Sequence, residues 1–209
     1  MKKLDFEKKL FKQGYKYIAG VDEVGRGPLA GPVVSACVVV DRRFLKDINN
    51  LQNLNDSKKT SEKNRDKIFA EIRNNAISVG IGVVNEKTID RINILQASLL
   101  SSKKAILSVK QKPDIVLVDG KYKIPDLDLN QEAIIQGDAK VAIIALASII
   151  AKVYRDKLMT KLSTKYPGYN FNKNKGYGTL EHREKIKELG PCGVHRLSFA
   201  PLKDLNKKY

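Results

Sequence analysis

The feature that most constrains the fold is a long helical segment predicted over residues 140–165, whose first half reads VAIIALASIIAKV and is nearly all apolar. A helix that is apolar on every side has to be buried. The apolar run falls short of the ~18 consecutive residues that indicate a membrane-spanning helix, so we expect protein rather than lipid to cover it. Hydrophobic residues make up 42% of the 209-residue chain, which is enough for a core that encloses such a helix.

Short runs rich in β-branched residues predict a sheet against which this helix can pack. Residues 17–23 and 32–41 are predicted as two strands, and the Gly and Pro residues between them favour a hairpin. The other predicted elements are strands at residues 77–84, 115–118 and 132–135 and helices at residues 61–76, 86–109 and 179–189. Strands and helices alternate after the opening hairpin, so the sequence predicts an α/β fold in which helices flank a mixed sheet.

The chain is strongly basic, with a formal net charge of +16 at pH 7, and its basic residues are densest toward the C-terminus. Residues 151–209 contain 14 Lys and Arg against 5 Asp and Glu, whereas the first 150 residues contain 25 against 18. Such a surplus favours a polyanionic partner, because contacts with phosphates supply much of the affinity for nucleic acids. A solvated, lysine-rich surface explains the same charge, so composition alone leaves both interpretations open.

Compartment is indicated by the N-terminus and the cysteines. The N-terminal sequence MKKLDFEKKLFK lacks the apolar segment of a secretion signal. Cys37 and Cys192 lie far apart in the chain and do not form a C-x-x-C motif. A disulfide framework is therefore not expected, and the sequence predicts a protein of the reducing cytoplasm.

Four acidic residues share one kind of position, because Asp22, Glu23, Asp119 and Asp138 each follow a short apolar run. The ends of neighbouring strands meet at one edge of an open α/β sheet, so these carboxylates are expected to lie close together. A carboxylate cluster repels itself unless cations hold it, and oxygen ligands without His or Cys favour Mg²⁺ or Mn²⁺. Two such ions about 3.5–4 Å apart activate a water molecule and stabilise the leaving oxygen when a phosphodiester is cleaved.

Each acid also has a simpler interpretation. An Asp-Glu pair is commonly solvated surface, Asp119 before a glycine suits a turn, and Asp138 before a helix suits an N-cap. Adjacent strand residues point to opposite faces of a sheet. Asp22 and Glu23 are therefore expected to line one site only if a bulge or an early strand end turns both inward, which the nearby glycines permit.

Two other site motifs are not supported by their context. The sequence GRGPLA at residues 25–30 fits the glycine pattern of dinucleotide-binding loops, but it leads into a β-branched run instead of the required helix. The two acids directly before it would also repel a pyrophosphate. The histidines, His182 and His195, lack Cys or His companions at ligand spacing, so a zinc site is not expected.

A series of sequence blocks resembles the bacterial ribonuclease HII family, the type 2 ribonucleases H. The blocks are GVDEVGRGPLAGPVV, LNDSKK, VDG, GDAK, ASIIAKVYRD, GYGT and HRLSF, and they extend over about residues 17–201. The resemblance implies an RNase H-like core over residues 1–165 and a C-terminal helical extension over residues 166–209 that packs on the core and binds substrate. It also implies a monomeric endonuclease that hydrolyses the RNA strand of RNA–DNA hybrids and incises duplex DNA 5′ of embedded ribonucleotides, as in ribonucleotide excision repair. The products would carry 5′-phosphate and 3′-hydroxyl ends.

The same blocks imply roles for individual residues. The family's four metal-binding acids are matched by Asp22, Glu23, Asp119 and Asp138. The loop that contacts the 2′-hydroxyl, which distinguishes RNA from DNA, is matched by Gly25, Arg26 and Gly27. The tyrosine that packs against the following deoxyribose is matched by Tyr177. Phosphate contacts before a helix N-terminus are expected from Asn55, Ser57 and Lys58.

For several matched residues a structural role stays open beside the functional one. The LNDSKK block also suits an ordinary polar loop and helix cap. Lys152, Arg155 and Asp156 are spaced for an ion pair within a helix or for contact with substrate. His195 and Arg196 suit either packing or contact with nucleic acid. The segments ALASII and GPCGVHRLSF depart from the family's commoner AAASIL and GPTPIHRRSF, whereas the four acids and the GRG motif are intact.

Three rival functions follow from the same motifs. Type 3 ribonuclease H shares much of the core, but that family carries a long N-terminal substrate-binding domain, and about sixteen residues precede Tyr17 here. A catalytically silent nucleic-acid-binding module is opposed by the four acids. A nuclease that acts on DNA alone is opposed by the GRG motif. The sequence therefore favours a type 2 ribonuclease H.

Overall fold

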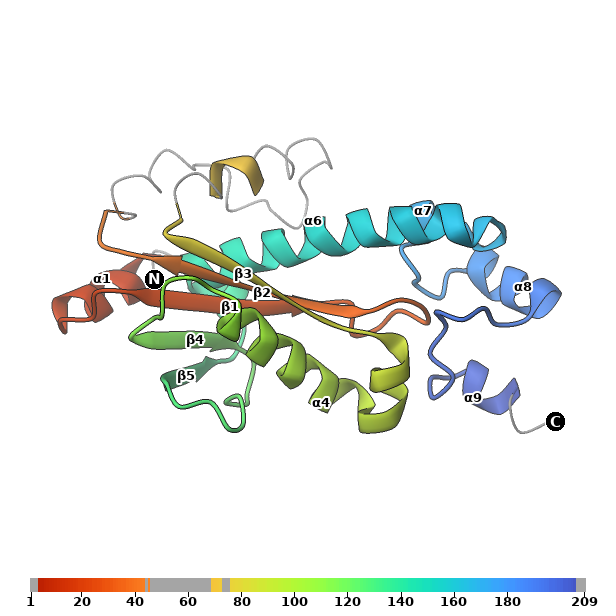
Figure 1. The fold of residues 1–209 in the computed structure, drawn as a ribbon, viewed down its shortest axis with the longest axis horizontal. Coiled ribbons are helices and arrows are strands. Elements are labelled where there is room, and N and C mark those ends of the chain that lie inside the picture. The colour runs from red at the N-terminus through yellow and green to blue at the C-terminus, as the bar shows by residue number, and fades with distance from the viewer. Residues whose placement is uncertain (1–3, 44, 46–68, 73–75, 206–209) are drawn as a thin grey trace.

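The computed structural model describes residues 4–43, 45, 69–72 and 76–205 (Figure 1). Of the helix predicted over residues 61–76, residues 69–72 are helical, and residues 61–68 and 73–75 lie outside the description. Within the described residues, no helix has both the length and the apolar character that crossing a membrane requires.

In the described chain, five strands form one mixed sheet in the order β3-β2-β1-β4-β5. The strands are β1 (Ile18–Val24), β2 (Val33–Val40), β3 (Ser78–Val84), β4 (Ile115–Asp119) and β5 (Asn130–Ile134). β1 and β2 form the predicted hairpin, β2 pairs antiparallel with β3, and β1, β4 and β5 pair in parallel. The chain crosses from β3 to β4 through the helix between them, and β4 enters the sheet parallel to β1. The mixed sheet predicted from the sequence is confirmed.

Two long helices cover opposite faces of the sheet (Figure 1). α6 (Ala142–Lys165) lies on one face over β1 and β2, and α4 (Glu86–Leu107) lies on the other over β2 and β3. Gly20 allows α6 to lie directly on β1, since a Cβ atom at this position would come within 2.5 Å of the Ile143 carbonyl carbon. The first half of α6 is buried almost throughout, as its apolar sequence predicts.

The helix predicted over residues 86–109 is interrupted at Asn93, whose backbone has φ 66° and ψ 167°. The Asn93 Oδ1 atom accepts hydrogen bonds from the amides of Leu95 and Gln96, at 3.0 and 3.1 Å. Asparagine commonly caps a helix N-terminus in this way, so a new helical segment begins here. The apolar pattern continues on both sides of Asn93, which is why the sequence predicts one uninterrupted helix.

The helix α1 (Asp5–Lys12) is not among the elements predicted from the sequence, yet it completes the N-terminus of α6. The Glu7 side chain is fully buried, and its Oε1 atom accepts a hydrogen bond from the amide of Ile143 at 3.0 Å. The N-cap residue of α6, Val141, has no side chain that can do this, so α1 supplies the acceptor from elsewhere in the fold. Burial raises the pKa of Glu7 to about 7 from its ordinary 4.5, and backbone hydrogen bonds oppose the rise only partly.

We expect Glu7→Gln to change how stability depends on pH. The raised pKa means that the folded protein holds the Glu7 proton more tightly than the unfolded chain does. The stability that this proton confers is complete below about pH 4.5 and is lost as pH rises to about 7. The free energy of unfolding of the wild type should therefore fall by about 3 kcal/mol relative to that of the variant across this window. Urea unfolding of both proteins at a series of pH values measures the difference, and a difference that does not vary with pH contradicts the assignment.

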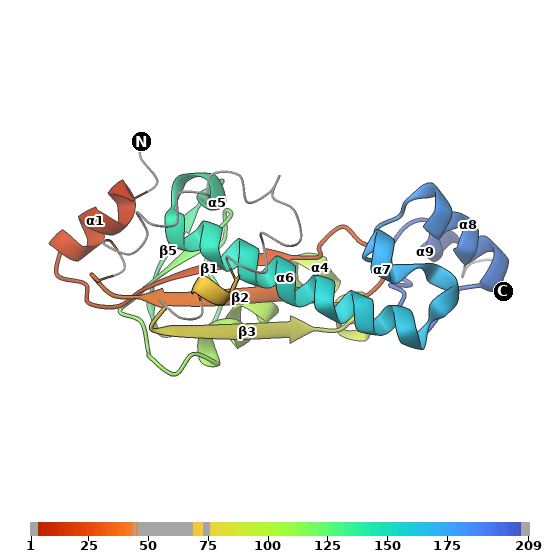
Figure 2. The ribbon, with the colours of Figure 1, turned by 90° about the horizontal axis from the view of Figure 1, so that it is seen from above.

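Residues 166–205 pack around the end of α6 farther from α1 (Figure 2). They contain η3 (Pro167–Tyr169), α7 (Phe171–Asn174), α8 (Leu180–Leu189) and α9 (Leu202–Leu205). The predicted helix at 179–189 is confirmed, and the hydroxyl of Thr179 caps α8 by accepting from the amide of His182. Apolar side chains of this segment share one cluster with Leu29 and Met159. The division into a core over residues 1–165 and an extension over residues 166–209 stays a prediction.

Candidate active site

Asp22 and Asp119 lie at the carboxyl ends of two adjacent parallel strands. The pairing of β1 with β4 ends with Val21 opposite Val118, so the next residue of each strand is one of these acids. Asp22 is only 6% exposed. Burial raises the pKa of Asp22 well above its ordinary value, and the negative charges of Glu23 and Asp119 add to the rise. Asp22, Glu23 and Asp119 therefore interact electrostatically, and the convergence of all four acids stays a prediction.

No bulge interrupts β1 at Asp22 and Glu23, so the bulge that the sequence allowed is absent. β1 continues regularly to Val24, with Asp22 opposite Ala36 and Glu23 opposite Ser35 on β2. The two side chains leave opposite faces of the sheet, as strand geometry requires. Burial raises the pKa of Glu23, the nearby Arg26 lowers it, and the charge of Asp119 raises it again. β1 ends at Val24, one residue after Glu23, and the charge of Asp119 acts on both acids.

Asp119, the third acid, contacts the backbone next to Asp138, the fourth. Its Oδ1 atom accepts a hydrogen bond from the amide of Gly137 at 2.6 Å. Gly137 begins the short helix α5 (Gly137–Lys140), and Asp138 is the next residue. The hydrogen bond thus holds the start of α5 at the carboxyl end of β4, one residue before Asp138.

The acids have the chemistry of a divalent-cation site, although their oxygens bond to protein groups in this structure. Asp22 Oδ1 accepts from the amide of Glu23 at 2.7 Å, and Glu23 Oε1 pairs with the Arg26 guanidinium at 3.1 Å. Within the described residues, no group of three or more His, Cys, Asp or Glu side chains is arranged to hold a metal ion. The donors are nevertheless all carboxylate oxygens, and their partly buried, mutually repelling charges favour a hard cation such as Mg²⁺ or Mn²⁺.

The loop of residues 25–27 follows the first two acids directly, and the fold brings Tyr177 beside it. Gly25 has φ 91°, which a residue with a side chain rarely adopts. A Cβ atom on Gly27 would lie 4.0 Å from Cε1 of Tyr177, which comes from the C-terminal segment and is 41% exposed. The glycine motif and the tyrosine, both singled out by sequence, therefore form one surface next to Asp22 and Glu23.

Other residues singled out by sequence lie beneath this surface or outside the description. Arg155 and Arg196 are fully buried under the loop of residues 25–27. Lys152 forms an ion pair with Asp156 along α6, with 2.7 Å between Nζ and Oδ1. Asn55, Ser57 and Lys58 lie outside the described residues, so their predicted phosphate contacts stay predictions.

His182 and His195 form a buried pair that the sequence analysis does not foresee. Their Nε2 atoms are 3.1 Å apart, and the sulfur of Cys192 lies 3.2 Å from Nδ1 of His195. Burial lowers the pKa of both rings, that of His195 to about 4, so both are neutral at pH 7. Nδ1 of His182 hydrogen-bonds the carbonyl of Tyr177 at 2.9 Å, so the pair supports the backbone of that tyrosine. The spacing Cys192-x-x-His195 was the available sequence signal for this cluster.

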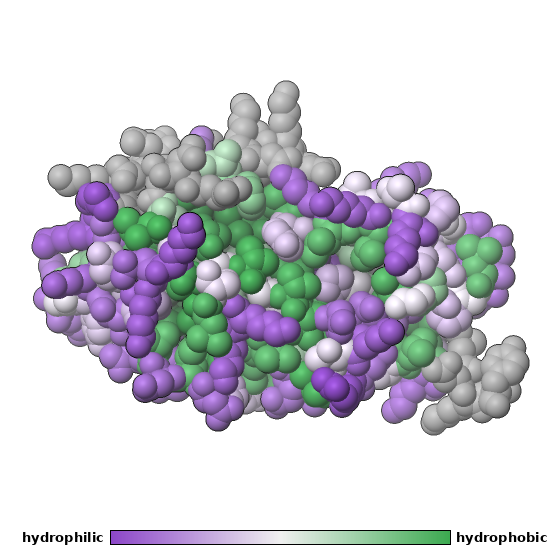
Figure 3. Space-filling view, viewed as in Figure 1, coloured by the Kyte–Doolittle hydropathy of each residue, from purple (hydrophilic) through white to green (hydrophobic). Residues whose placement is uncertain are grey.

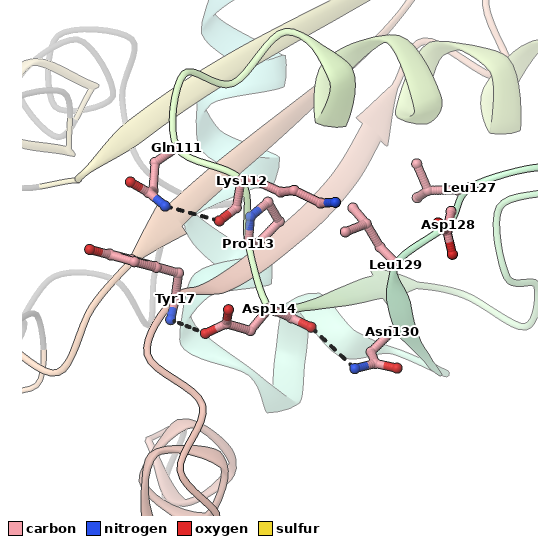
Figure 4. Close-up of a pocket in the computed structure, with 9 residues that line it drawn as sticks. All are labelled: Tyr17, Gln111, Lys112, Pro113, Asp114, Leu127, Asp128, Leu129 and Asn130. Atoms are coloured by element: carbon pink, nitrogen blue, oxygen red, sulfur yellow. Dashed lines mark hydrogen bonds between the residues drawn. The ribbon is translucent and has the colours of Figure 1, made fainter.

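Two surface hollows lie away from the acids. One is at the opposite ends of β1, β4 and β5, where Asp114 Oδ2 accepts the amides of Lys16 and Tyr17 at 2.7 and 2.8 Å (Figure 4). These hydrogen bonds tie the start of β1 to the start of β4. The other is mainly apolar and lies between α4 and residues 124–126. On the face drawn in Figure 3, apolar side chains gather in the middle and hydrophilic ones lie at the margins.

Acids at the carboxyl ends of adjacent strands in a β3-β2-β1-β4-β5 sheet, with helices on both faces, define a nuclease of the ribonuclease H fold. The chain is similar to ribonuclease H2 from Pyrococcus horikoshii, with a TM-score of 0.77 and 27% identity, over 92% of this chain and 98% of that chain. It is also similar to ribonuclease HII of Archaeoglobus fulgidus, solved as a complex with PCNA, with a TM-score of 0.72 and 28% identity, over 87% of this chain and 94% of that chain.

Sequence comparison narrows this class to one family. A model of the ribonuclease HII family matches residues 19–202. The ribonuclease HII of Caldicellulosiruptor bescii is 52% identical over 195 residues, which are 93% of this chain and 92% of that protein. The chain belongs to the ribonuclease HII family. It is therefore a nuclease, and its activity is that of a ribonuclease H, which acts on RNA–DNA hybrids.

Proposed function

We propose that this ribonuclease incises duplex DNA on the 5′ side of embedded ribonucleotides, in addition to cleaving the RNA strand of hybrids, and leaves 5′-phosphate and 3′-hydroxyl ends. The observation that carries the proposal is that the loop follows the first two acids directly in the chain. Asp22 and Glu23 lie near the end of β1, and residues 25–27 come next, with Tyr177 beside them. A single ribonucleotide bound at this loop would place its phosphodiester next to the carboxylates.

We assign Asp22, Glu23, Asp119 and Asp138 to the binding of two Mg²⁺ or Mn²⁺ ions. When bound, such ions supply an activated water and stabilise the leaving oxygen. The support is electrostatic, because burial and mutual repulsion raise the pKa values of Asp22 and Glu23, and a cation would relieve both costs. Asp119 and Asp138 contribute from β4 and α5, so the site draws on three separate elements of the core.

Recognition of the ribose is assigned to Gly25, Arg26, Gly27 and Tyr177. A loop with two glycines lets backbone groups approach the 2′-hydroxyl, which both donates and accepts hydrogen bonds. The exposed face of Tyr177 suits a deoxyribose. A ribose packed against the apolar ring would leave its 2′-hydroxyl without a hydrogen-bond partner, and deoxyribose has no such hydroxyl. The chain has a net charge of +16, and its basic residues supply attraction for the phosphates. This combination fits repair of ribonucleotides in DNA.

The test is incision of a DNA duplex that contains one ribonucleotide, with Mg²⁺ and Mn²⁺ supplied separately. We expect a single cut on the 5′ side of the ribonucleotide, and no cut in the same duplex made entirely of DNA. A 2′-O-methyl group at the ribonucleotide removes the donor hydrogen and adds bulk, so it should lower cleavage by at least about tenfold. Cleavage of long hybrids with the single-ribonucleotide duplex left intact would contradict the proposal, and so would indifference to the methyl group.

A further inference from the structure

Two buried arginines lie beneath the loop of residues 25–27, where Arg196 bonds the backbone of the loop itself and Arg155 bonds the backbone that follows it. Arg196, from the C-terminal segment, donates to the carbonyl oxygens of Gly25 at 2.6 Å and of Arg26 at 3.0 Å. It also donates twice to the carbonyl of Gly31, at 3.0 and 2.8 Å. Arg155, from α6, donates to the carbonyls at both sides of that residue, Ala30 at 3.1 Å and Pro32 at 2.9 Å. Both arginines are 0% exposed.

These two cations are held by carbonyl dipoles. Among the described residues, neither guanidinium forms an ion pair with a carboxylate. Burial lowers the pKa of Arg155 to about 10 and that of Arg196 to about 9, so both remain charged at pH 7. A buried charge without a counter-ion is costly, and apolar residues would fill the same volume at lower cost. What the arginines offer that apolar residues cannot is a rigid set of guanidinium donors, which can bond several carbonyls in a fixed geometry.

The bonds to Arg196 also fix the direction of the loop's amide groups. A trans peptide is planar, so its N–H points opposite to its C=O. The cis peptide of the described chain is at Ala200-Pro201, which leaves the loop peptides trans. Since the carbonyls of Gly25 and Arg26 point inward to Arg196, the amides of Arg26 and Gly27 point away from it. Neither of these amides donates a hydrogen bond to any described part of the chain.

We propose that Arg196, assisted by Arg155, is a positioning residue that sets the discrimination between ribose and deoxyribose. It does so by holding two consecutive loop amides outward as donors for the 2′-hydroxyl. Arg155 adds contact with Gly25 and lies 5.9 Å from the centre of the Tyr177 ring, so it links both halves of the recognition surface. The proposal rests on the proposed ribose recognition by residues 25–27. It places Arg196 behind the loop, where it does not contact the nucleic acid itself.

The test compares wild type with Arg196→Lys, which keeps the charge but offers one point donor in place of a planar fork. Binding is measured in Ca²⁺ with a duplex that holds one ribonucleotide and with the same duplex made of DNA. We expect the affinity ratio to fall by about tenfold in the variant. Backbone order parameters of Arg26 and Gly27 should fall from rigid values toward those of a flexible loop. Ile106→Ala, in a core cluster on the α4 face of the sheet, is the control for lost stability alone.

A second measurement needs no variant. In Ca²⁺, the ribonucleotide duplex should shift the amide resonances of Arg26 and Gly27 in the wild type and leave the Arg196 guanidinium resonances in place. Shifted Arg196 resonances with unmoved loop amides would overturn the proposal. The proposal would also be overturned if the Arg196→Lys protein folded and discriminated as well as the wild type. It would be overturned equally if Arg196→Lys lost no more discrimination than the Ile106→Ala control. Failure of the wild type itself to prefer the ribonucleotide duplex would instead refute the proposed ribose recognition.

Discussion

Replacing Asp22 with asparagine is expected to abolish cleavage while making the metal-free protein more stable. The change removes a carboxylate charge from the proposed ion site and keeps the size of the side chain, so we expect the turnover rate on an RNA–DNA hybrid to fall by roughly three orders of magnitude. Burial disfavours the charged form of Asp22, and its charge repels Glu23 and Asp119. Loss of that charge should therefore stabilise the protein in EDTA by on the order of 1 kcal/mol, or ~2–4 °C in melting temperature.

Opposite effects on activity and stability separate a functional acid from a structural one. Hybrid binding in Ca²⁺ should survive in Asp22→Asn, because the loop and the basic residues are unchanged. Asp128→Asn is the matched control, since Asp128 is an exposed acid at the other edge of the sheet and should change neither property. Substantial Mg²⁺-dependent activity in Asp22→Asn would remove Asp22 from the proposed metal site.

Gly25→Ala is expected to reduce incision at a single ribonucleotide by about 100-fold. Gly25 has φ 91°, and a Cβ atom there would lie 2.3 Å from Nε of Arg155. The buried guanidinium bonds three backbone carbonyls, so it cannot move aside easily, and the loop has to shift away from Arg155. Displacement of residues 25–27 would misplace the ribose relative to Asp22 and Glu23. Steady-state kinetics on the single-ribonucleotide duplex measures the loss.

Gly14→Ala controls for the backbone strain in that experiment. Gly14 has a similar φ of 96°, but no atom lies within 4 Å of the position of an added Cβ. It lies between α1 and β1, away from the acids. Both variants pay about 1–2 kcal/mol for a left-handed residue with a side chain, and only Gly25→Ala collides with Arg155. Equal activity in the two variants would show that contact between the loop and Arg155 does not matter for cleavage.

The elements that the sequence predicts best are those whose pattern is set by burial. α6 is predicted from its apolar run and the β1–β2 hairpin from its β-branched residues, because each is buried whatever its partner is. Two features that the sequence analysis misses depend on particular tertiary or side-chain contacts. α1 is a charged helix that buries Leu10 and Phe11 in the core and Glu7 against α6, and the break in α4 depends on one side chain, Asn93.

The same distinction holds for the site. The sequence predicts a site at Asp22, Glu23, Asp119 and Asp138 because acids after apolar runs fall at strand ends, and the resemblance to the ribonuclease HII family implies the role of residues 25–27. The bulge that the sequence allowed at Asp22 and Glu23 is absent, because β1 keeps regular pairing with β2 as far as Val24. For Arg155 and Arg196 the sequence left packing and substrate contact open, since a guanidinium that bonds carbonyls and one that bonds phosphate look identical in a sequence.

By itself, then, the sequence determined the family to which the chain belongs, and through that resemblance it predicted which residues cleave the phosphodiester and which contact the ribose. Sequence blocks are sufficient for this, because each motif extends over a few positions. Only the tertiary structure decided which strands are neighbours and what lies beneath the loop. Arg196 meets Gly25 across 171 positions of the chain, and Arg155 meets Pro32 across 123. Such contacts depend on how α6 and the C-terminal segment pack against the sheet, and the local sequence pattern does not predict that packing.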